Sequence, residues 1–242
     1  MENGIEIFLL ASGASFVQRT TGFGFGIFIM TVLPFLMPSY GEATTLSGLL
    51  ALTTSITIAF RMRKLVSWKR LCPILGAFII VSAASICFLN RIEGNLMRQI
   101  LGGTLIITGL YFAFLRNRIR IGTTPAWQIG TGMLSGVMGG FFGMQGPPAV
   151  LYFISSEPDK EHYMAMTQMY FAIGNAGMTI IRSCNGYLSE TVGWGYLAGL
   201  GGAAVGLLLG GYAFRHIPNR IFSYIVYAYI CISGLIILLT SL

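Results

Sequence analysis

The stretch Gly139–Pro148 reads G-G-F-F-G-M-Q-G-P-P and lies inside an apolar run from about Ala126 to Ser155. One uninterrupted helix is not expected here, because glycine costs about 1 kcal/mol and proline about 3 kcal/mol relative to alanine inside a helix. Pro147 and Pro148 instead suit the first turn of a new helix, where the N–H that proline lacks would be unpaired anyway. We therefore predict a helix that stops near Gly139, a short unwound segment, and a second helix that starts at Pro147.

The composition places this stretch in a membrane protein. Of the 242 residues, 55% are hydrophobic and only 10% are charged, whereas soluble domains average about 25% charged residues. Unwound backbone at membrane depth is tolerated only where it is buried in protein or lines a wet cavity, so the break is a candidate site. The net charge of +7 fits an excess of basic residues in cytoplasmic loops. We expect a lipid bilayer around the protein and no nucleic-acid partner.

Eight apolar runs follow one another along the chain: Gly4–Met37, Ala43–Phe60, Leu71–Leu89, Leu96–Leu115, Ala126–Ser155, Tyr163–Ile181, Gly193–Phe214 and Ile221–Leu242. The first and fifth are too long for one span and are interrupted by glycines. In the first run, the limbs Gly4–Gln18 and Ile27–Met37 would be roughly 22 and 16 Å long, less than the bilayer core of about 30 Å. Each of the two runs is therefore predicted to form a hairpin of short helices that meet tip-inward.

The order of one long run and three short ones occurs twice, which indicates an internal repeat. A shift of 121 residues aligns Gly22 with Gly143, Ser47 with Gln168, Thr54 with Asn175 and Arg61 with Arg182. We predict two homologous halves, residues 1–118 and 126–242, joined by a linker at 119–125.

The basic residues predict the orientation. The loop Arg61–Arg70 carries five Lys and Arg residues and should be cytoplasmic, whereas its repeat mate near Arg182–Gly193 falls outside. The halves would then be inverted. The predicted fold is an all-α membrane protein with two inverted-topology repeats, each a broken or re-entrant hairpin followed by three transmembrane helices, giving about 8–10 membrane segments. We expect it in the cell (inner) membrane with both termini extracytoplasmic.

With these features the chain resembles the TauE/SafE sulfite exporters, also called the TSUP family. The resemblance rests on the repeated long run, on G-F-G-F-G (Gly22–Gly26) and on the segment Ser135–Pro148. The family shows a G-[IM]-G-G-[GP] type motif in both halves. Gly143–Pro147 fits it with Gln145 at a common glycine position, and Gly22–Gly26 fits it more loosely. The resemblance implies transport of sulfite, sulfoacetate, another sulfonate or an organic anion. No cysteine is next to either glycine motif, which argues against the thiosulfate-importing branch.

Arg19 is the main candidate for the charge that binds substrate. It lies in Q-R-T-T-G (Gln18–Gly22), at the break of the first long run. An arginine at membrane depth is costly and normally faces a cavity or a partner. Its planar fork suits a sulfonate or carboxylate with two oxygens. The alternatives are an arginine that binds backbone carbonyls of the break, or one that snorkels to the interface.

The glycine breaks supply the second set of candidates. Helices that begin near Gly26 and at Pro147 would direct N–H groups and a partial positive charge at an anion. Close packing of small residues between helices is the alternative reading of the glycines. Polar residues on the following spans could line the same cavity or only bind neighbouring helices. The predicted substrate-binding residues are Gln18, Arg19, Thr20, Thr21, Gly22, Gly24, Gly26, Thr54, Gly143, Gln145, Gly146, Pro147, Gln168 and Asn175.

Other chemistry is not expected. The two histidines, His162 and His216, are far apart in sequence, and the four cysteines lack metal-binding spacing. We predict no metal, no cofactor and no enzymatic activity. Arg61 and Arg182 lie at predicted span ends and are interpreted as lying at the membrane interface.

The leading hypothesis is a secondary transporter, an exporter of a small anion by alternating access. The alternatives are an anion channel of the same fold and a non-transport membrane subunit. A homodimer is left open.

Overall fold

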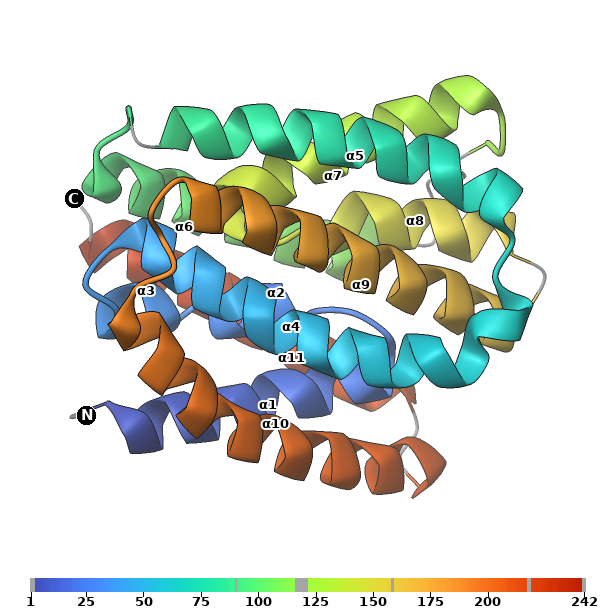
Figure 1. The fold of residues 1–242 in the computed structure, drawn as a ribbon. Coiled ribbons are helices and arrows are strands. Elements are labelled where there is room, and N and C mark those ends of the chain that lie inside the picture. The colour runs from blue at the N-terminus through green and yellow to red at the C-terminus, as the bar shows by residue number, and fades with distance from the viewer. Residues whose placement is uncertain (1–2, 90, 116–121, 158, 217–218, 241–242) are drawn as a thin grey trace.

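The computed structural model describes residues 3–89, 91–115, 122–157, 159–216 and 219–240 (Figure 1). Helices make up 87% of the structure, and the described residues contain no strand. The predicted all-α class is confirmed. The predicted boundary at residue 118 lies outside the described residues, and α7 (Pro125–Phe142) begins at the last residue of the predicted linker.

The first part of the chain contains two long helices that flank short ones. Its elements are α1 (Gly4–Thr21), α2 (Phe25–Ile29), α3 (Leu33–Leu36), α4 (Tyr40–Met62), η1 (Arg63–Leu65), α5 (Trp68–Leu89), α6 (Gly94–Leu110) and η2 (Tyr111–Leu115). The predicted limb Ile27–Met37 is not one helix, because the turn at Met30–Val32 separates α2 from α3. Pro34 starts the second of these helices in its first turn, where proline is tolerated.

The second part also begins with an 18-residue helix that ends at a break. After α7 come α8 (Gly146–Ser156), α9 (Lys160–Cys184), α10 (Glu190–His216) and α11 (Asn219–Thr240). The predicted break is confirmed but is shorter than expected. The helix α7 continues past Gly139 to Phe142, and only Gly143–Gln145 separate it from α8. Pro147 and Pro148 lie in the first turn of α8, as predicted.

The helices pack in pairs around the antiparallel pair α4 and α9 (Figure 1). The pair α5 and α7 covers one side of this centre, the pair α1 and α10 covers the other, and α6 packs on α11. Burial follows this arrangement. In the most apolar window of α4, 67% of the residues are buried, against 39% in α5 and 33% in α10.

Three helices of the described chain are long and apolar enough to cross a membrane: Tyr40–Leu65, Trp68–Leu89 and Glu190–Ala213. The central helix α9 is not among them, because it carries polar residues that are buried inside the protein. Exposed apolar side chains cover the outer helices, including Ile80 and Phe88 on α5 and Leu197 and Leu208 on α10. Such a surface suits contact with lipid, and the protein is a membrane protein.

Candidate functional site

The two helix breaks meet in the middle of the protein. Both α1 and α7 end at a glycine in the left-handed conformation, Gly22 with φ 86° and Gly143 with φ 67°. Glycine adopts this conformation without the steric cost that a Cβ brings. The backbone at Gly26 packs directly on the carbonyl group of Gly143, so that a Cβ at residue 26 would collide with it. The sequence predicted this close approach of two breaks from residues more than a hundred positions apart.

A small cavity of about 30 Å³ lies between the two breaks. Its lining comes from α1, both breaks, α4 and α9, and consists of Gln18, Gly24, Phe25, Gly26, Ile27, Ala51, Ser55, Gly143, Met144, Gln145, Gly146, Phe171 and Asn175. No charged side chain is among these residues. The cavity can hold a few water molecules, since one needs about 10–15 Å³ of such space, and it is too small for an organosulfonate. In this structure the cavity is therefore closed to an anion of that size.

A buried amide network closes the cavity on the α1 side. The Nε2 of Gln18 donates to Ser55 Oγ at 2.9 Å and to Gln168 Oε1 at 3.0 Å, while Thr54 Oγ1 donates to Gln18 Oε1 at 2.8 Å. The Nε2 of Gln168 donates to the carbonyl oxygen of Gly22 at 2.7 Å. All four side chains are buried. A satisfied network of this kind holds a unique geometry in a low-dielectric interior, so it positions the end of α1 against α9.

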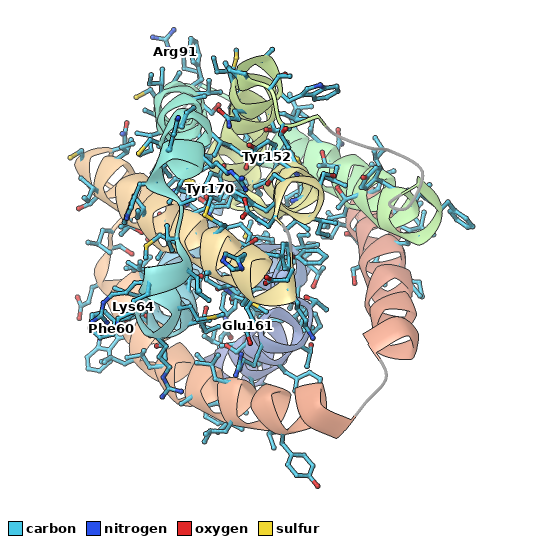
Figure 2. All side chains as sticks on the ribbon, turned by 90° about the vertical axis from the view of Figure 1, so that its right-hand side faces the viewer. Phe60, Lys64, Arg91, Tyr152, Glu161 and Tyr170 are labelled. Carbon is cyan, nitrogen blue, oxygen red and sulfur yellow. The ribbon has the colours of Figure 1, made fainter. Side chains whose placement is uncertain are left out.

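A second network holds the break between α7 and α8. The hydroxyl of Tyr170 donates to Ser135 Oγ at 2.8 Å, and Ser135 Oγ donates to the carbonyl oxygen of Gln145. Figure 2 shows Tyr170 and Tyr152 inside the bundle, whereas Phe60 and Lys64 lie at its rim. The Gln145 side chain has one long contact, from Nε2 to the Phe171 carbonyl at 3.5 Å, and its buried Oε1 has no partner among the described residues. Gln145 is thus held by its backbone, and its amide group can change partners.

The electrostatics of the cavity come from α8 more than from α2. A helix N-terminus carries a partial positive charge, and α8 is 11 residues long, whereas α2 has only five. Pro147 and Pro148 remove two of the N–H groups that a helix start normally offers. Gly146 keeps its N–H and lines the cavity. The sequence predicted two helix N-termini that face the cavity. Only the N-terminus of α8 contributes a substantial partial positive charge, together with a few amide donors.

The structure brings half of the predicted site residues to the cavity wall. Those that line it are Gln18, Gly24, Gly26, Gly143, Gln145, Gly146 and Asn175. Thr54, Gln168 and the Gly22 carbonyl lie one hydrogen bond behind Gln18. Thr20 and Thr21 donate to the backbone of their own helix or break, and Pro147 is buried outside the lining.

Arg19 does not line the cavity. Its Cβ and Cγ pack against Gly210 of α10, and its Nε lies 3.7 Å from the Cβ position of Gly211. The side chain is half-buried and points to the α1–α10 interface. A ligand role for Arg19 stays a prediction, as does snorkelling to the membrane interface, and the position outside the cavity wall gives the ligand role no support.

Arg182 was placed at the interface by the sequence analysis, and this was wrong. Its side chain has 0% exposure. The Nη1 donates to the Thr44 carbonyl at 2.9 Å, and Nη2 donates to the carbonyls of Gly139 at 2.9 Å and Gly140 at 3.1 Å. These two carbonyls belong to the last turn of α7, and the Gly139 carbonyl also accepts from the backbone N–H of Gly143 at 3.0 Å. The position of Arg182 near a span end did not indicate that it is buried. The spacing of seven residues from Gln168 to Asn175 and to Arg182 does place all three on one helix face.

The sequence analysis also missed part of the cavity wall. Ser55 is next to the predicted Thr54 on α4, and its Oγ accepts a hydrogen bond from Gln18 Nε2. The apolar part of the wall is formed by Phe25, Ile27, Ala51, Met144 and Phe171. Phe25 and Met144 lie inside the two glycine motifs, whereas the other three have no distinguishing sequence signal in an apolar chain. No group of three or more His, Cys, Asp or Glu that could hold a metal ion occurs among the described residues.

Fold and cavity together define a multi-pass α-helical membrane protein built around two broken helices. The model of the family described as "Sulfite exporter TauE/SafE" matches residues 7–237, and the chain belongs to this family of transporters. One curated relative is the "Probable sulfite/organosulfonate exporter TauE" of Cupriavidus necator (strain H16). It is 23% identical over 190 residues, which cover 76% of this chain and 73% of the relative. No solved structure matches the chain at the significance threshold applied.

Proposed function

We propose that the protein is a secondary transporter that exports a small anion, such as sulfite, sulfoacetate or another organosulfonate, by alternating access. The observation that carries the proposal is the small cavity between two helix breaks, with neutral polar side chains in its wall. Transporters with discontinuous helices bind substrates at such breaks near the middle of the bilayer. The name of the Cupriavidus relative supports the substrate class, because that protein is described as a sulfite/organosulfonate exporter.

Helix bounds support the proposed inverted repeat. Both α1 and α7 have 18 residues, and their first residues, Gly4 and Pro125, are 121 positions apart. The same offset separates the left-handed glycines, Gly22 and Gly143, and the first residues of α2 and α8, Phe25 and Gly146. This offset is the one that aligned the two halves of the sequence.

Helix packing supports it independently. Exchanging the two halves turns the pair α1–α10 into α7–α5, and both pairs are present. The same exchange leaves α4–α9 and α6–α11 unchanged, as a two-fold relation requires. Figure 1 shows α1 and α7 running toward the centre from opposite ends of the molecule. Two halves of opposite orientation can rock against a shared site, which is the usual basis of alternating access.

Recognition of an anion in the proposed site relies on neutral donors. Gln18, Ser55, Gln145, Gly146 and Asn175, which line the cavity, carry neutral hydrogen-bonding groups. The dipole of α8 adds a partial positive charge. Neutral donors let the anion leave again, whereas a fixed charge in a dry cavity would hold it tightly. The small volume means that the tips must separate before a sulfonate group can enter.

The direction of transport fits the membrane potential. We propose that η1 and the basic loop around it face the cytoplasm of an inner-membrane protein, which places both termini outside. An anion moving outward then travels toward the positive side. This movement provides about 2.3 kcal/mol per charge per 100 mV, so export needs no carboxylate relay for protons.

Reconstitution into liposomes tests the proposal. Vesicles preloaded with sulfite, sulfoacetate, thiosulfate or a small carboxylate are diluted into labelled sulfite, and uptake is followed over time. We expect saturable uptake that is accelerated by internal sulfite or sulfoacetate, because a carrier must return its site. A channel of the same fold would instead give flux proportional to concentration without acceleration by internal anion. No flux of any sulfur oxyanion would contradict the proposed substrate class.

A further inference from the structure

Among the residues that the structure describes, Arg182 is the most deeply buried charged one. Neither of the two ion pairs in the described part of the chain involves it. Its charge is met only by three carbonyl oxygens and by the partial negative charge at the end of α7. A buried cation compensated this weakly is a binding-site candidate in a membrane protein.

Arg182 and three residues of the same two helices carry buried polar atoms without partners. Arg182 Nε, Tyr40 Oη, Ser47 Oγ and Thr179 Oγ1 are buried and have no hydrogen-bond partner among the described residues. They belong to the facing helices α4 and α9. Buried polar groups are normally paired. All four can donate a hydrogen bond, and a set of donors beside a fixed positive charge selects an anion.

Gly48 has no side chain and leaves space between Arg182 and Thr179. A Cβ built on Gly48 would lie 3.4 Å from Arg182 Nη1 and 3.7 Å from Thr179 Oγ1, which are ordinary contact distances. A space the size of a methyl group therefore separates the guanidinium from the threonine hydroxyl. Ser47 directly precedes Gly48 on α4, and its Oγ lies 3.7 Å from the Cβ position of Gly143. This unpartnered hydroxyl is therefore next to the break that bounds the central cavity.

A buried polar stripe connects this place to the cavity. Gln168, Asn175 and Arg182 recur every seven residues on α9 and have exposures of 0%, 3% and 0%. Asn175 lines the cavity, Gln168 binds the end of α1, and Arg182 binds the end of α7. Movement of either break relative to α9 must therefore exchange partners along this stripe.

From these contacts we infer that Arg182, Thr179, Ser47 and Tyr40 form a second binding station for the transported small anion, on the α9 C-terminal side of the cavity. The inference rests on the proposed transport function. When the end of α7 moves away, the guanidinium exchanges the Gly139 and Gly140 carbonyls for the oxygens of the anion. In the closed conformation the carbonyls occupy these positions. The central cavity supplies neutral donors, and this station supplies the fixed charge on the way out.

Two variants test the station without removing the guanidinium. Gly48→Ala fills the space beside Arg182 without a steric clash, and alanine is favoured over glycine inside a helix. Thr179→Val removes one donor at nearly constant volume. The matched control is Gly103→Ala on α6, where an added Cβ meets nothing within 4 Å. For each purified variant, sulfite counterflow in liposomes gives KM and maximal rate, and thermal unfolding is measured with sulfite against gluconate at constant ionic strength.

Gly48→Ala takes up space that the anion would need, and Thr179→Val loses one hydrogen bond to a charged group. We expect each variant to raise KM about tenfold and to reduce the stabilisation by sulfite. Gly103→Ala should behave as wild type, and the unliganded unfolding temperatures should stay near that of wild type. If wild type shows saturable exchange and both variants keep its KM and its sulfite stabilisation, Arg182 is only a structural clamp and the inference is overturned. Absence of saturable exchange in wild type would instead overturn the transport function on which the inference rests.

Discussion

The carbonyl oxygen of Gly143 occupies the space that a Cβ on Gly26 would need. This contact joins the break of the first hairpin to the break of the second, across 117 positions of sequence. It explains why the two breaks can share one small cavity, because no side chain separates their backbones. Any relative movement of the halves must change this contact.

Gly26→Ala tests the crossing of the two breaks. The added methyl group meets backbone, which cannot rotate away as a side chain can. Overpacking of this kind typically costs about 1–3 kcal/mol. We expect a lower unfolding temperature in detergent and a large loss of sulfite exchange.

Gly130→Ala on α7 is the matched control, since an added Cβ there meets nothing within 4 Å. It should keep wild-type exchange and stability. Normal exchange by Gly26→Ala would mean that the two breaks do not need to approach each other as the structure shows.

The amide pair Gln18 and Gln168 predicts an energetic coupling between α1 and α9. Gln168→Met removes the donor to the Gly22 carbonyl and leaves a buried acceptor unpaired, at a cost of about 1–3 kcal/mol. Because the two amides also bind each other at 3.0 Å, a double-mutant cycle with Gln18→Met should give a coupling of about 0.5–3 kcal/mol. Strict additivity of the two unfolding free energies would show that the network does not hold α1.

Arg19→Gln distinguishes the predicted role of Arg19 in binding substrate from a packing role between α1 and α10. The side chain packs on Gly210 and lies outside the cavity wall. We therefore expect KM for sulfite to change less than about threefold, under 1 kcal/mol in binding, while the protein loses stability through the α1–α10 contact. A KM increase of about a hundredfold with unchanged stability would restore Arg19 as the ligand of the anion.

The start of α9 predicts a pH dependence. Asp159 caps this helix, with Oδ1 accepting from the N–H groups of Glu161 and His162 at 2.9 Å each. The backbone N–H of His162 and then its side chain lower the pKa of Asp159 below 3.8. A lowered pKa means that the charged cap stabilises the folded state at neutral pH and loses this effect as pH falls through the folded-state pKa.

Asp159→Ala should accordingly unfold at a lower temperature than wild type at pH 7, and the difference should shrink as the pH drops below about 4. Asp159→Asn keeps an acceptor at the cap and serves as the control, with a smaller loss at pH 7. A difference that stays constant down to pH 3 would show that the charge of Asp159 does not contribute.

The positions of the helix breaks could be predicted from sequence because their causes are local. Glycine and proline act on the backbone of their own turn, so Gly22, Gly143 and Pro147 marked the ends of α1 and α7 and the start of α8 within a few residues. The polar positions Gln168 and Asn175 were predictable for a related reason. Helical spacing places them on one face, and amides in an apolar helix must bind something.

The location of the fixed charge could not be predicted in this way. Arg19 and Arg182 both lie near the ends of apolar runs, and their burial depends on which helix packs beside them. α10 leaves Arg19 half-buried, whereas α4 and the end of α7 enclose Arg182 completely. That difference arises from long-range packing. The separation of α2 from α3 is similar, since the run Ile27–Met37 is uniformly apolar up to Pro34 apart from Thr31.

The most direct test of the proposed site is the concentration dependence of sulfite counterflow in liposomes for wild type and Asn175→Leu, a variant that keeps the branched shape of the side chain but removes an amide from the cavity wall. We predict saturation and acceleration by internal sulfite in wild type, and a KM at least about tenfold higher in Asn175→Leu at similar stability. Equal KM values in the two proteins, or flux that rises linearly with sulfite and ignores internal anion, would contradict transport through the cavity between the two breaks.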